Sequence, residues 1–425
     1  MARTINRRRF IQSAAAASLP LLLPRRALGA SPNEQVTLGC IGMGNHGVGW
    51  NLAAILKIPE ARVVAVCDVF TDRRESARDT VNAAYGNQDC AAIADFREVL
   101  ARPDIDAVVI STPDHWHVLM SVMAARAGKD VFCEKPTLNI DQGQVLIDVM
   151  NETGVVYQGG IEDRSVDQYY RIAALARNGM LGTVRHIRVG LPSGEVFPKE
   201  DEAPVPEGFD YDLWLGPARY TPYTPTKTGA QQWRNVWDYS GGKLTDWGAH
   251  LMDTAQVAIF EEHRGPVEVD GKGVFPTDAL SNTATEYEIH YRYASGVEML
   301  VKSGGPGIRV EGDDGWIECP GWRQPLKASD PALLDAALPA DNKLWPQPPT
   351  EHVDFIRAVQ QRTKTTYSPT DIHHLSTAMH LGNISMRLGR KIQWDAKTQT
   401  IIGDDEATAL RSCPLRAPWT FDATA

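Results

Sequence analysis

The sequence of 425 residues has no apolar run that reaches the length of about 20 residues needed to span a bilayer. Its six cysteines are scattered, and no two of them have the C-x-x-C spacing of a metal cluster. It has no excess of positive charge, with 43 Lys and Arg against 53 Asp and Glu. These absences argue against a membrane span, a disulfide framework, a metal site and a nucleic-acid partner. The composition is that of a globular protein with two or three domains.

The first 30 residues differ from the rest, because they hold six arginines and no acidic residue. Three arginines at positions 7 to 9 precede a run rich in alanine and leucine that ends at Leu23, and small residues follow from Ala27 to Ser31. This order is typical of a twin-arginine export signal, with a basic amphipathic helix or a membrane anchor as alternatives. We therefore expect a periplasmic or otherwise exported protein, with cleavage near Ala30. Because this route carries folded proteins, a nucleotide bound in the cytoplasm can be exported with the chain.

Short apolar runs then alternate with helical stretches. The expected strands are Val36–Ile41, Val63–Cys67, Ala107–Ser111, Val131–Cys133 and Val155–Tyr157, and the expected helices are Val48–Leu56, Arg73–Ala84, His117–Ala127 and Gln142–Asn151. Strands that are apolar throughout, each followed by a helix, predict an α/β fold with a doubly wound parallel sheet of the Rossmann type.

After Gly159 the regular alternation of strands and helices ends. A helix at Gln168–Arg177 precedes an irregular stretch from Pro192 to Gln232, a helix near Ala249–Phe260, and alternating strands at Thr283–Tyr293 and Val297–Lys302. Alternation suits a sheet with one solvated or interface face, so we expect a second domain of the α+β class. The predicted division is a signal segment at 1–30, a nucleotide-binding domain at 31–157 and a substrate-binding and oligomerisation domain at 158–425.

The first strand runs into Gly42-Met43-Gly44-Asn45-His46-Gly47, the G-x-G-x-x-G pattern of dinucleotide-binding loops. The glycines permit a tight turn, a close approach to a pyrophosphate and close packing of helix on strand. Asp68 ends the second strand, where a carboxylate can bind a ribose diol and repel a 2′-phosphate. This favours NAD over NADP, although Arg73 and Arg74 keep NADP as a minority interpretation. The alternative is a glycine turn in an unrelated α/β protein.

Two more segments follow later strands, at the edge where such sheets bind ligands. They are Ser111-Thr112-Pro113-Asp114-His115-Trp116-His117 and Glu134-Lys135-Pro136. Lys135 is either an ordinary surface lysine or an ammonium group placed at the edge of the cofactor. His115 and His117 have a metal-ligand spacing but no convincing third ligand, so we assign them to the cofactor and expect no metal. The predicted cofactor contacts are Gly42, Gly44, Asn45, His46, Gly47, Asp68, Thr112, Pro113, His115, Trp116, His117, Glu134 and Lys135.

Together these motifs resemble the Gfo/Idh/MocA sugar oxidoreductases, and the resemblance spans essentially the whole chain after the signal. The segments that carry it are Gly42–Gly47, Thr112-Pro113, Glu134-Lys135-Pro136, Tyr211–Pro217, Gly241–His250, Leu381–Ile384 and Leu388–Asp395. It implies a Rossmann domain followed by a mainly antiparallel open sheet, which often mediates homo-oligomers.

The resemblance also assigns the chemistry. Lys135 would hold and polarise the reacting oxygen, and His250 would be the general base or acid. Asp246 would bind the substrate hydroxyl and tune His250, four residues later on the same face of a helix that we expect at Thr245–Phe260. An imidazole that titrates near neutrality suits removal of a hydroxyl proton during hydride transfer. The alternative for this pair is an Asp that caps a helix and a histidine without a role in catalysis.

The expected substrate is a sugar or polyol, because four tryptophans lie between Tyr211 and His250, and aromatic faces cover the C–H faces of sugars. Core packing is the alternative for each of them. Other family members have a glutamine-rich segment ending in Arg-Ser where this chain has Glu162-Asp163-Arg164-Ser165. Arg164 matches the arginine of the family segment, whereas Glu162 and Asp163 change the contacts expected with the substrate. The predicted substrate-binding residues are Arg164, Trp233, Arg234, Tyr239, Asp246 and His250.

Three functions fit this pattern. The first is an NAD(P)-dependent oxidoreductase that acts on a secondary hydroxyl of a sugar or polyol. The second is a redox-neutral glycoside hydrolase that oxidises the sugar, eliminates the aglycone, adds water and re-reduces the product. The same Lys135, Asp246 and His250 can serve both. The third is a sensor without catalytic activity, which the intact set of three residues disfavours.

Overall fold

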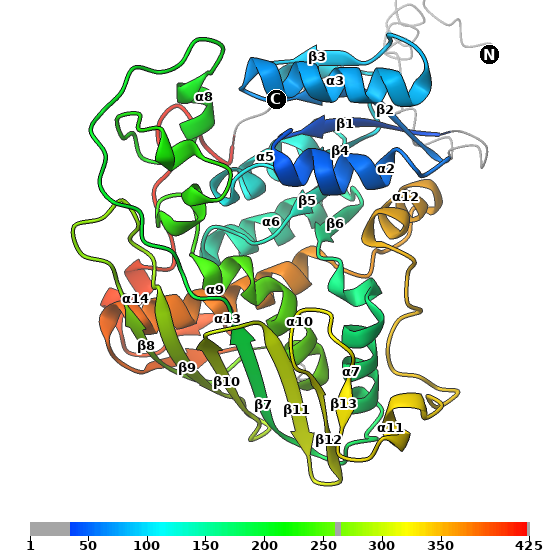
Figure 1. The fold of residues 1–425 in the computed structure, drawn as a ribbon, viewed down its shortest axis with the longest axis vertical. Helices are drawn as coiled ribbons and strands as arrows, with labels where there is room; N and C mark the ends of the chain where they lie inside the picture. The colour runs from blue at the N-terminus through cyan, green and yellow to red at the C-terminus, as the bar shows by residue number, and fades with distance from the viewer. Residues whose placement is uncertain (1–34, 260–264, 423–425) are drawn as a thin grey trace, which may run out of the picture. The chain divides into compact units, whose positions relative to one another are not determined.

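The parallel sheet expected near the start of the chain is present, with six strands. The computed structural model describes residues 35–259 and 265–422, so the predicted export signal at 1–30 lies outside the described residues. The strands are β1 (Val36–Ile41), β2 (Ala61–Cys67), β3 (Ala91–Ile93), β4 (Ala107–Ile110), β5 (Asp130–Glu134) and β6 (Tyr157–Gly160). They are all parallel, in the order β3-β2-β1-β4-β5-β6 (Figure 1). The chain therefore leaves β1 toward one side and β4 toward the other, and ligands of such sheets bind at that switch point.

Both faces of this sheet are buried, which explains why its central strands β1, β2, β4 and β5 are mainly apolar. Residues of the central strands divide between two separate cores, with Cys67 and Ile110 in one and Leu38 and Phe132 in the other. The helices between the strands are α2 (Ala53–Ile55), α3 (Thr71–Tyr85), α4 (Phe96–Ala101), α5 (Asp114–Arg126) and α6 (Ile140–Thr153), and the π-helical turn η2 (Gly47–Leu52) leads into α2.

One helix of this layer comes from much later in the chain. The helix α12 (Glu351–Gln361) packs on the sheet, where Phe355 meets Phe132 edge-on with ring centroids 5.8 Å apart. The division into 31–157 and 158–425 stays a prediction. The later region nevertheless completes the core of the earlier one.

The second sheet has nine strands in the order β13-β12-β11-β7-β10-β9-β8-β14-β15. They are β7 (Val184–Leu191), β8 (Glu268–Val274), β9 (Glu286–Arg292), β10 (Glu298–Ser303), β11 (Gly307–Gly312), β12 (Gly315–Cys319), β13 (Lys327–Ala328), β14 (Ile392–Asp395) and β15 (Thr400–Ile401). Within this sheet β7 and β10 pair in parallel, and the other described strand pairs of the sheet are antiparallel. The expected α/β fold with a mainly antiparallel open sheet is thus confirmed.

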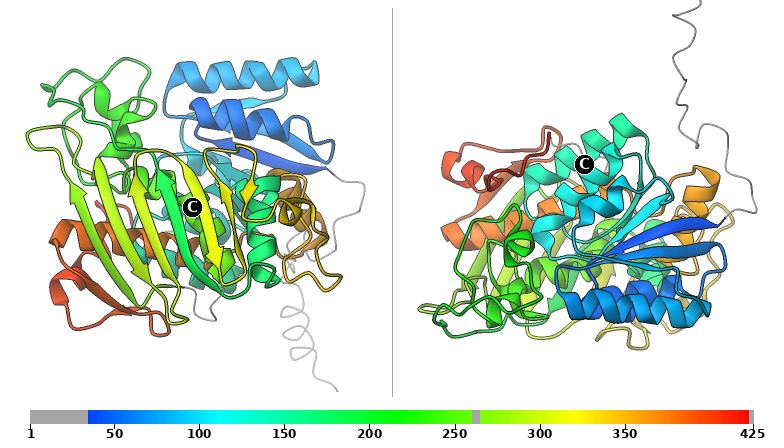
Figure 2. Two further views of the ribbon diagram at one scale, coloured as in Figure 1. Left: turned by 60° about the horizontal axis from the view of Figure 1, so that its bottom comes forward. Right: turned by 90° about the horizontal axis from the view of Figure 1, so that it is seen from above.

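Helices cover one face of this sheet. These are α7 (Asp167–Arg177), α10 (Gly248–Ile259) and α13 (Pro369–Leu388), and no helix of the described residues covers the other face (Figure 2). That open face carries charged side chains in ion pairs, such as Lys302 with Glu288 at 2.9 Å. Strand β9 alternates buried and accessible residues along its length, as the period-two pattern predicts.

The remaining elements are mostly short. They are η3 (Asp163–Ser165), α8 (Tyr211–Leu215), η4 (Thr226–Thr228), η5 (Gln232–Asn235), α9 (Lys243–Asp246), α11 (Ala332–Asp335) and α14 (Asp405–Ala409). Among the described helices, none combines the length and apolar character that a bilayer crossing requires.

The irregular stretch expected after Pro192 packs back on the first sheet. Phe209 stacks on Phe70 with centroids 3.9 Å apart, and the amide of Thr71 donates to the carbonyl of Gly208 at 2.8 Å. This contact places the stretch at the end of β2, directly after Asp68. The stretch consequently forms one wall of the cavity described next.

Candidate active site

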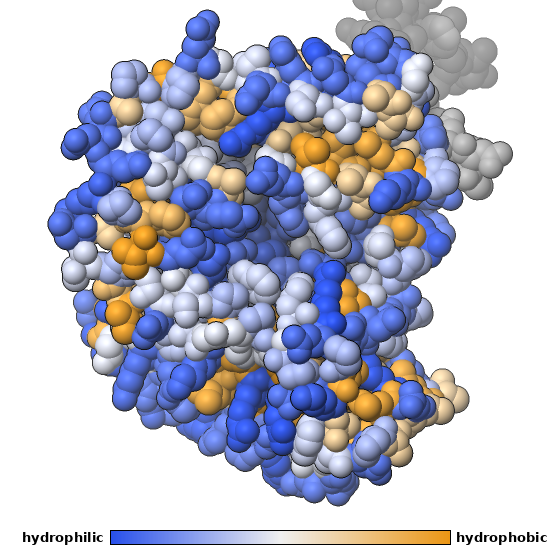
Figure 3. Space-filling model, viewed as in Figure 1, coloured by the Kyte–Doolittle hydropathy of each residue, from blue (hydrophilic) through white to orange (hydrophobic). Residues whose placement is uncertain are grey.

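A cavity of about 490 Å³ lies at the carboxyl ends of the parallel strands. Its size falls within the range of small-molecule sites. Figure 3 shows this face hollowed between the two sheets, with mainly hydrophilic residues around the hollow. The predicted residues that line the cavity are Gly42, Gly44, Asn45, His46, Gly47, Asp68, Thr112, Pro113, Trp116, His117, Glu134, Lys135, Trp233, Arg234, Asp246 and His250.

The glycine loop has the geometry that its pattern predicts. Gly42 has φ +88°, and a Cβ there would lie 2.7 Å from the carbonyl of Ser111. A Cβ at Gly47 would lie 1.9 Å from the carbonyl oxygen of Gly42. At Gly44 the nearest atom would be the Arg73 guanidinium at 3.9 Å, so this glycine leaves open space beside the cavity. The loop can therefore receive a pyrophosphate against its backbone.

The variant Gly47→Ala should lose both stability and nucleotide affinity, because a Cβ at 1.9 Å from a backbone oxygen forces the loop to move. We expect a cost of about 1–3 kcal/mol or more in the free energy of unfolding. Thermal unfolding and NAD titration measure the two effects. Gly49→Ala in the same turn is the control, since a Cβ there has no neighbour within 4 Å and should change neither property. Equal behaviour of the two variants would contradict the assignment.

Asp68 lies at the cavity with its carboxylate fixed by the backbone. Its Oδ2 accepts a hydrogen bond from the amide of Met43 at 2.7 Å, and its Oδ1 accepts one from the amide of Phe70 at 2.9 Å. Burial raises the pKa of Asp68, while these two amides and the charge of Arg73 act in the opposite direction. Each oxygen keeps a second lone pair for a ribose hydroxyl.

Lys135 extends from the end of β5 to the second half of the chain. Its Nζ donates to the backbone carbonyl of Asp246 at 2.8 Å and lies 3.2 Å from Oδ1 of the same residue. Its neighbour Glu134 lies 2.9 Å from His46 Nε2 and accepts from Asn51 at 2.9 Å. Burial opposes the charge on Glu134, but His46 and Lys135 lower its pKa to about 2. The ionised Glu134, at the end of β5, thus contacts His46 and links the glycine loop to the strand that precedes Lys135.

Asp246 is surrounded by cations. Besides Lys135, the Nε of Arg234 lies 3.3 Å from Oδ1 and the Nζ of Lys243 lies 4.0 Å from Oδ2. Although burial opposes the charge, Arg234, Lys135 and Lys243 together hold the pKa of Asp246 well below its usual range. Asp246 therefore stays ionised and orients the ammonium of Lys135.

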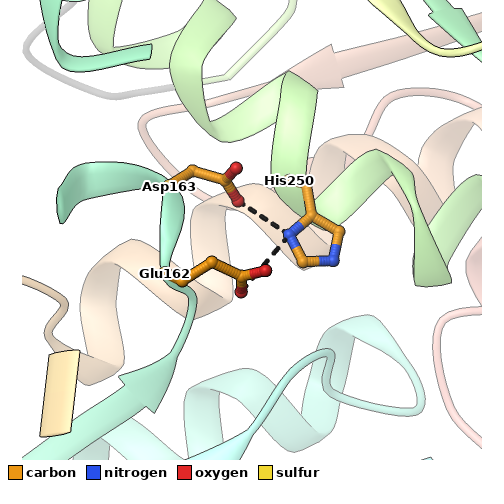
Figure 4. A group of neighbouring side chains, drawn as sticks. All are labelled: Glu162, Asp163 and His250. Atoms are coloured by element: carbon orange, nitrogen blue, oxygen red, sulfur yellow. Dashed lines mark hydrogen bonds and ion pairs between the residues drawn. The ribbon is translucent and has the colours of Figure 1, made fainter. Parts of the chain in front are cut away.

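His250 faces a different set of charges (Figure 4). Its Nδ1 lies 2.7 Å from Oδ2 of Asp163 and 3.7 Å from Oε2 of Glu162. The helix expected at Thr245–Phe260 is broken at Trp247 into α9 and α10, and Phe260 lies outside the described residues. No hydrogen bond joins Asp246 to His250 in the described chain. The charge of Asp246 acts to raise the pKa of His250 against burial, and the tuning of His250 by Asp246 stays a prediction.

Glu162, Asp163 and His250 also present one possible metal-binding atom each, all within 4.8 Å of one another. The guanidinium of Arg323 already pairs with Glu162 at 2.9 Å. The positive charges of Arg323 and Lys135 act on Asp163 as well. Two cations beside the group oppose the approach of a divalent ion, and we assign no metal to it.

Three predicted contacts lie away from the cavity. Arg164 is buried with Asp253, at 2.7 Å from Nη2 to Oδ1, so its guanidinium is used inside the protein. Tyr239 is fully buried and its hydroxyl lies 3.0 Å from Thr221 Oγ1. His115 is buried with Nε2 2.9 Å from the carbonyl of Trp214. The structure thus corrects the predicted substrate role of Arg164 and Tyr239 and the cofactor role of His115, which are all structural contacts here.

Aromatic side chains form part of the cavity lining. Trp247, Trp322 and His250 pack edge-on, with Trp322 centroids 5.0 Å from both of the others. Trp50 lines the same cavity and lies under the guanidinium of Arg323. Trp50, Trp322, Glu162 and Arg323 were missed by sequence reasoning, although the two acids at 162 and 163 follow β6 at the same sheet edge as Lys135. Of the four tryptophans expected at the site, Trp237 does not line the cavity.

Comparisons with known proteins agree with this arrangement. Residues 36–161 match the family described as "Oxidoreductase family, NAD-binding Rossmann fold", and residues 193–421 match "Oxidoreductase family, C-terminal alpha/beta domain". The chain is similar to "scyllo-inositol 2-dehydrogenase (NAD(+))" of Bacillus subtilis, with 33% identity over 31% of this chain and 37% of that protein. It is also similar to "Glycosyl hydrolase family 109 protein" of Saccharopolyspora erythraea, with 35% identity over 28% of this chain and 27% of that protein.

The match to curated relatives is partial, whereas the match to solved folds is nearly complete. The chain spans between about a quarter and about a half of the length of the curated relatives it matches. The crystal structure of aldose-aldose oxidoreductase from Caulobacter crescentus superposes with a TM-score of 0.61 at 18% identity. That superposition covers 85% of this chain and 100% of the other, and it shows the shared fold.

Proposed function

Because the chain belongs to the Gfo/Idh/MocA oxidoreductase family, we propose that it oxidises a secondary hydroxyl of a sugar or polyol with NAD as the hydride acceptor. The observation that carries the proposal is the meeting of Lys135 and His250 at one cavity with the glycine loop. The similarity to an inositol dehydrogenase supports the choice of substrate class.

The cavity residues fit the cofactor. The loop glycines leave room for a pyrophosphate, and Asp68 offers a carboxylate for a ribose. The hydroxyl of Thr112 is buried at the cavity wall without a partner in the described structure, so it is available to a ligand. When bound, the nicotinamide supplies the hydride acceptor, and the protein's own groups handle the oxygen and its proton.

Lys135 and His250 divide that work. The ammonium of Lys135, oriented by Asp246, stabilises negative charge that develops on the reacting oxygen. His250 accepts the hydroxyl proton, because burial lowers its pKa to about 4 and keeps the ring neutral near pH 7. Trp247 and Trp322 offer apolar faces to the C–H groups of a sugar.

Asp68→Ala should weaken NAD binding by about 10- to 100-fold, because a charged acceptor for the ribose is lost. It should also reduce the preference for NAD over NADP, since the carboxylate no longer repels a 2′-phosphate. Titration with both nucleotides measures the two affinities, and Asp72→Ala, an exposed aspartate four residues later, is the control. An unchanged preference for NAD would show that Asp68 does not select the cofactor.

A glycoside hydrolase that uses the same residues is the second candidate, favoured by the similarity to the hydrolase relative. The experiment is to purify the protein without added nucleotide, identify any bound NAD by mass, and supply chromogenic glycosides and free sugars. NADH formation from a free sugar or polyol without aglycone release supports the dehydrogenase. Aglycone release with the resident cofactor and no net NADH supports the hydrolase.

Export by the twin-arginine route and assembly into homo-oligomers complete the proposal. An exported enzyme meets no cytoplasmic NAD pool, so it would retain its nucleotide and turn it over in place. The open face of the nine-stranded sheet is the surface we propose for subunit contacts.

A further inference from the structure

The two ring nitrogens of His250 have different surroundings. Nδ1 lies 2.7 Å from a carboxylate oxygen of Asp163, which is buried in the turn η3 after β6. The other nitrogen points away from both acids (Figure 4), and His250 lines the cavity. An ionised carboxylate accepts hydrogen bonds only, so Nδ1 must carry the proton in that state. The lone pair of the neutral ring is then on Nε2.

Asp246 cannot accept this hydrogen bond from Nδ1 of His250. Its Oδ1 is shared by Lys135 at 3.2 Å and Arg234 at 3.3 Å, and its backbone carbonyl also accepts from Lys135. The break at Trp247 separates it from the helix that carries His250. The charged residues of the cavity thus form two groups, one around Asp246 and one around His250.

Resting on the proposed function, we propose that Asp163 is the positioning residue for His250. It holds Nδ1 as the proton-bearing nitrogen, presents Nε2 to the substrate hydroxyl, and stabilises the imidazolium after proton transfer. The proton moves from the hydroxyl oxygen to Nε2, and the carbon that bears this oxygen gives up its hydride to the NAD of the proposed function, so the alcohol becomes a ketone. Asp163 keeps its own bond to Nδ1 throughout and touches no substrate.

Glu162 is a more distant partner of the same nitrogen. It lies 3.7 Å from Nδ1, and its other oxygen pairs with Arg323 at 2.9 Å. Arg323 comes from the loop after β12, so that loop holds Glu162 away from the ring. A carboxylate-to-amide change at residue 162 is therefore a matched control for the same change at residue 163.

The charges around the pair set its pH dependence. Besides each other, the charged groups that act on the two residues are Glu162, Lys135, Asp246 and Glu134 for His250, and Asp253, Arg323 and Lys135 for Asp163. Burial and Asp253 raise the pKa of Asp163 to about 8. Asp163 and His250 titrate as a coupled pair, so below about pH 8 the two residues share one additional proton. Loss of this proton as the pH rises frees Nε2, and oxidation should accelerate with increasing pH.

The test compares Asp163→Asn with Glu162→Gln in kcat and KM for sugar or polyol oxidation as a function of pH. For Asp163→Asn we expect kcat to fall about 10- to 100-fold, a part of the roughly 100- to 10,000-fold that a general base contributes. The acid limb of the pH profile, the rise of kcat with pH on the acidic side, should move by about one pH unit or more to lower pH. Without the buried carboxylic acid only His250 titrates there, and burial lowers its pKa. KM should change little.

Glu162→Gln should shift the acid limb of the profile less than Asp163→Asn does. An unchanged limb in Asp163→Asn, with kcat within about twofold of the wild type, would overturn the proposal, since a purely structural role does not set a pKa. An acid limb that shifts in Glu162→Gln but not in Asp163→Asn would also overturn the proposal.

Nitrogen-15 NMR of the histidines in the wild-type protein tests the same proposal without turnover, with His250→Gln to assign the signal. At about pH 9, above the titration of the pair, Nδ1 should be the protonated nitrogen and Nε2 the unprotonated one. The opposite tautomer would overturn the proposal. This result stands even if Asp163→Asn fails to fold or the protein oxidises no sugar, so failure of the proposed function remains distinguishable.

Discussion

Replacing Lys135 with methionine is expected to lower kcat by roughly 100- to 1000-fold while leaving the nucleotide bound. Methionine has a similar length but carries neither charge nor hydrogen-bond donors, so negative charge on the reacting oxygen is no longer stabilised. Lys135 makes its two hydrogen bonds with Asp246 and lies at the cavity wall, with its side chain 9% exposed. The measurement is kcat together with NAD affinity by titration.

The control for this variant is Lys57→Met, an exposed lysine after α2, which should retain wild-type turnover. If Lys135→Met turned over as fast as the wild type, the oxygen would have to be held elsewhere, and the proposed catalytic site would be wrong. If it lost NAD affinity as well, Lys135 would serve the cofactor rather than the reacting oxygen.

Replacing His250 with glutamine is expected to lower kcat by roughly 100- to 10,000-fold, the contribution of a general base. The glutamine side chain can still hydrogen-bond to Asp163, but it cannot take the hydroxyl proton. The acid limb of the pH profile should disappear with the imidazole. We would measure kcat between pH 5 and 10, a range of about five units that includes the expected titration of the pair.

His290→Gln is the matched control for this substitution, because His290 lies exposed on β9 of the second sheet. Its pH profile should match that of the wild type. A His250→Gln enzyme that kept its acid limb would place the titrating base on another residue, and Glu162 would then be the first to test.

Local sequence signals predicted the nucleotide half of the site. The glycines, Asp68, Thr112 and Lys135 each follow a buried strand, and strand ends in a parallel sheet meet at one edge by construction. Gly42 and Gly47 show why the pattern is reliable, since both positions leave no space for a Cβ. The same reasoning correctly gave the α/β fold and the alternating strands of the second sheet.

Partners that are distant in sequence could not be predicted in the same way. Asp163 and His250 are 87 residues apart, and Arg164 meets Asp253 across 89 residues. The spacing of Asp246 and His250 did not indicate these partners, because Asp246 pairs with Lys135 and Arg234 whereas Nδ1 of His250 faces Asp163. Isolated aromatics such as Trp50 and Trp322 give no periodic signal, so only tertiary packing shows that they line the cavity.

The most direct test of the account is the transfer of deuterium from a carbinol carbon to the nucleotide. The protein would be loaded with NAD and mixed with inositols, aldoses and glycosides that carry deuterium at their ring carbinol carbons, and the nucleotide would be analysed by mass. We predict deuterated NADH with at least one of these substrates in the wild type and little or none with Lys135→Met. Bound NAD that stays unreduced by every sugar, polyol and glycoside would contradict the central claim.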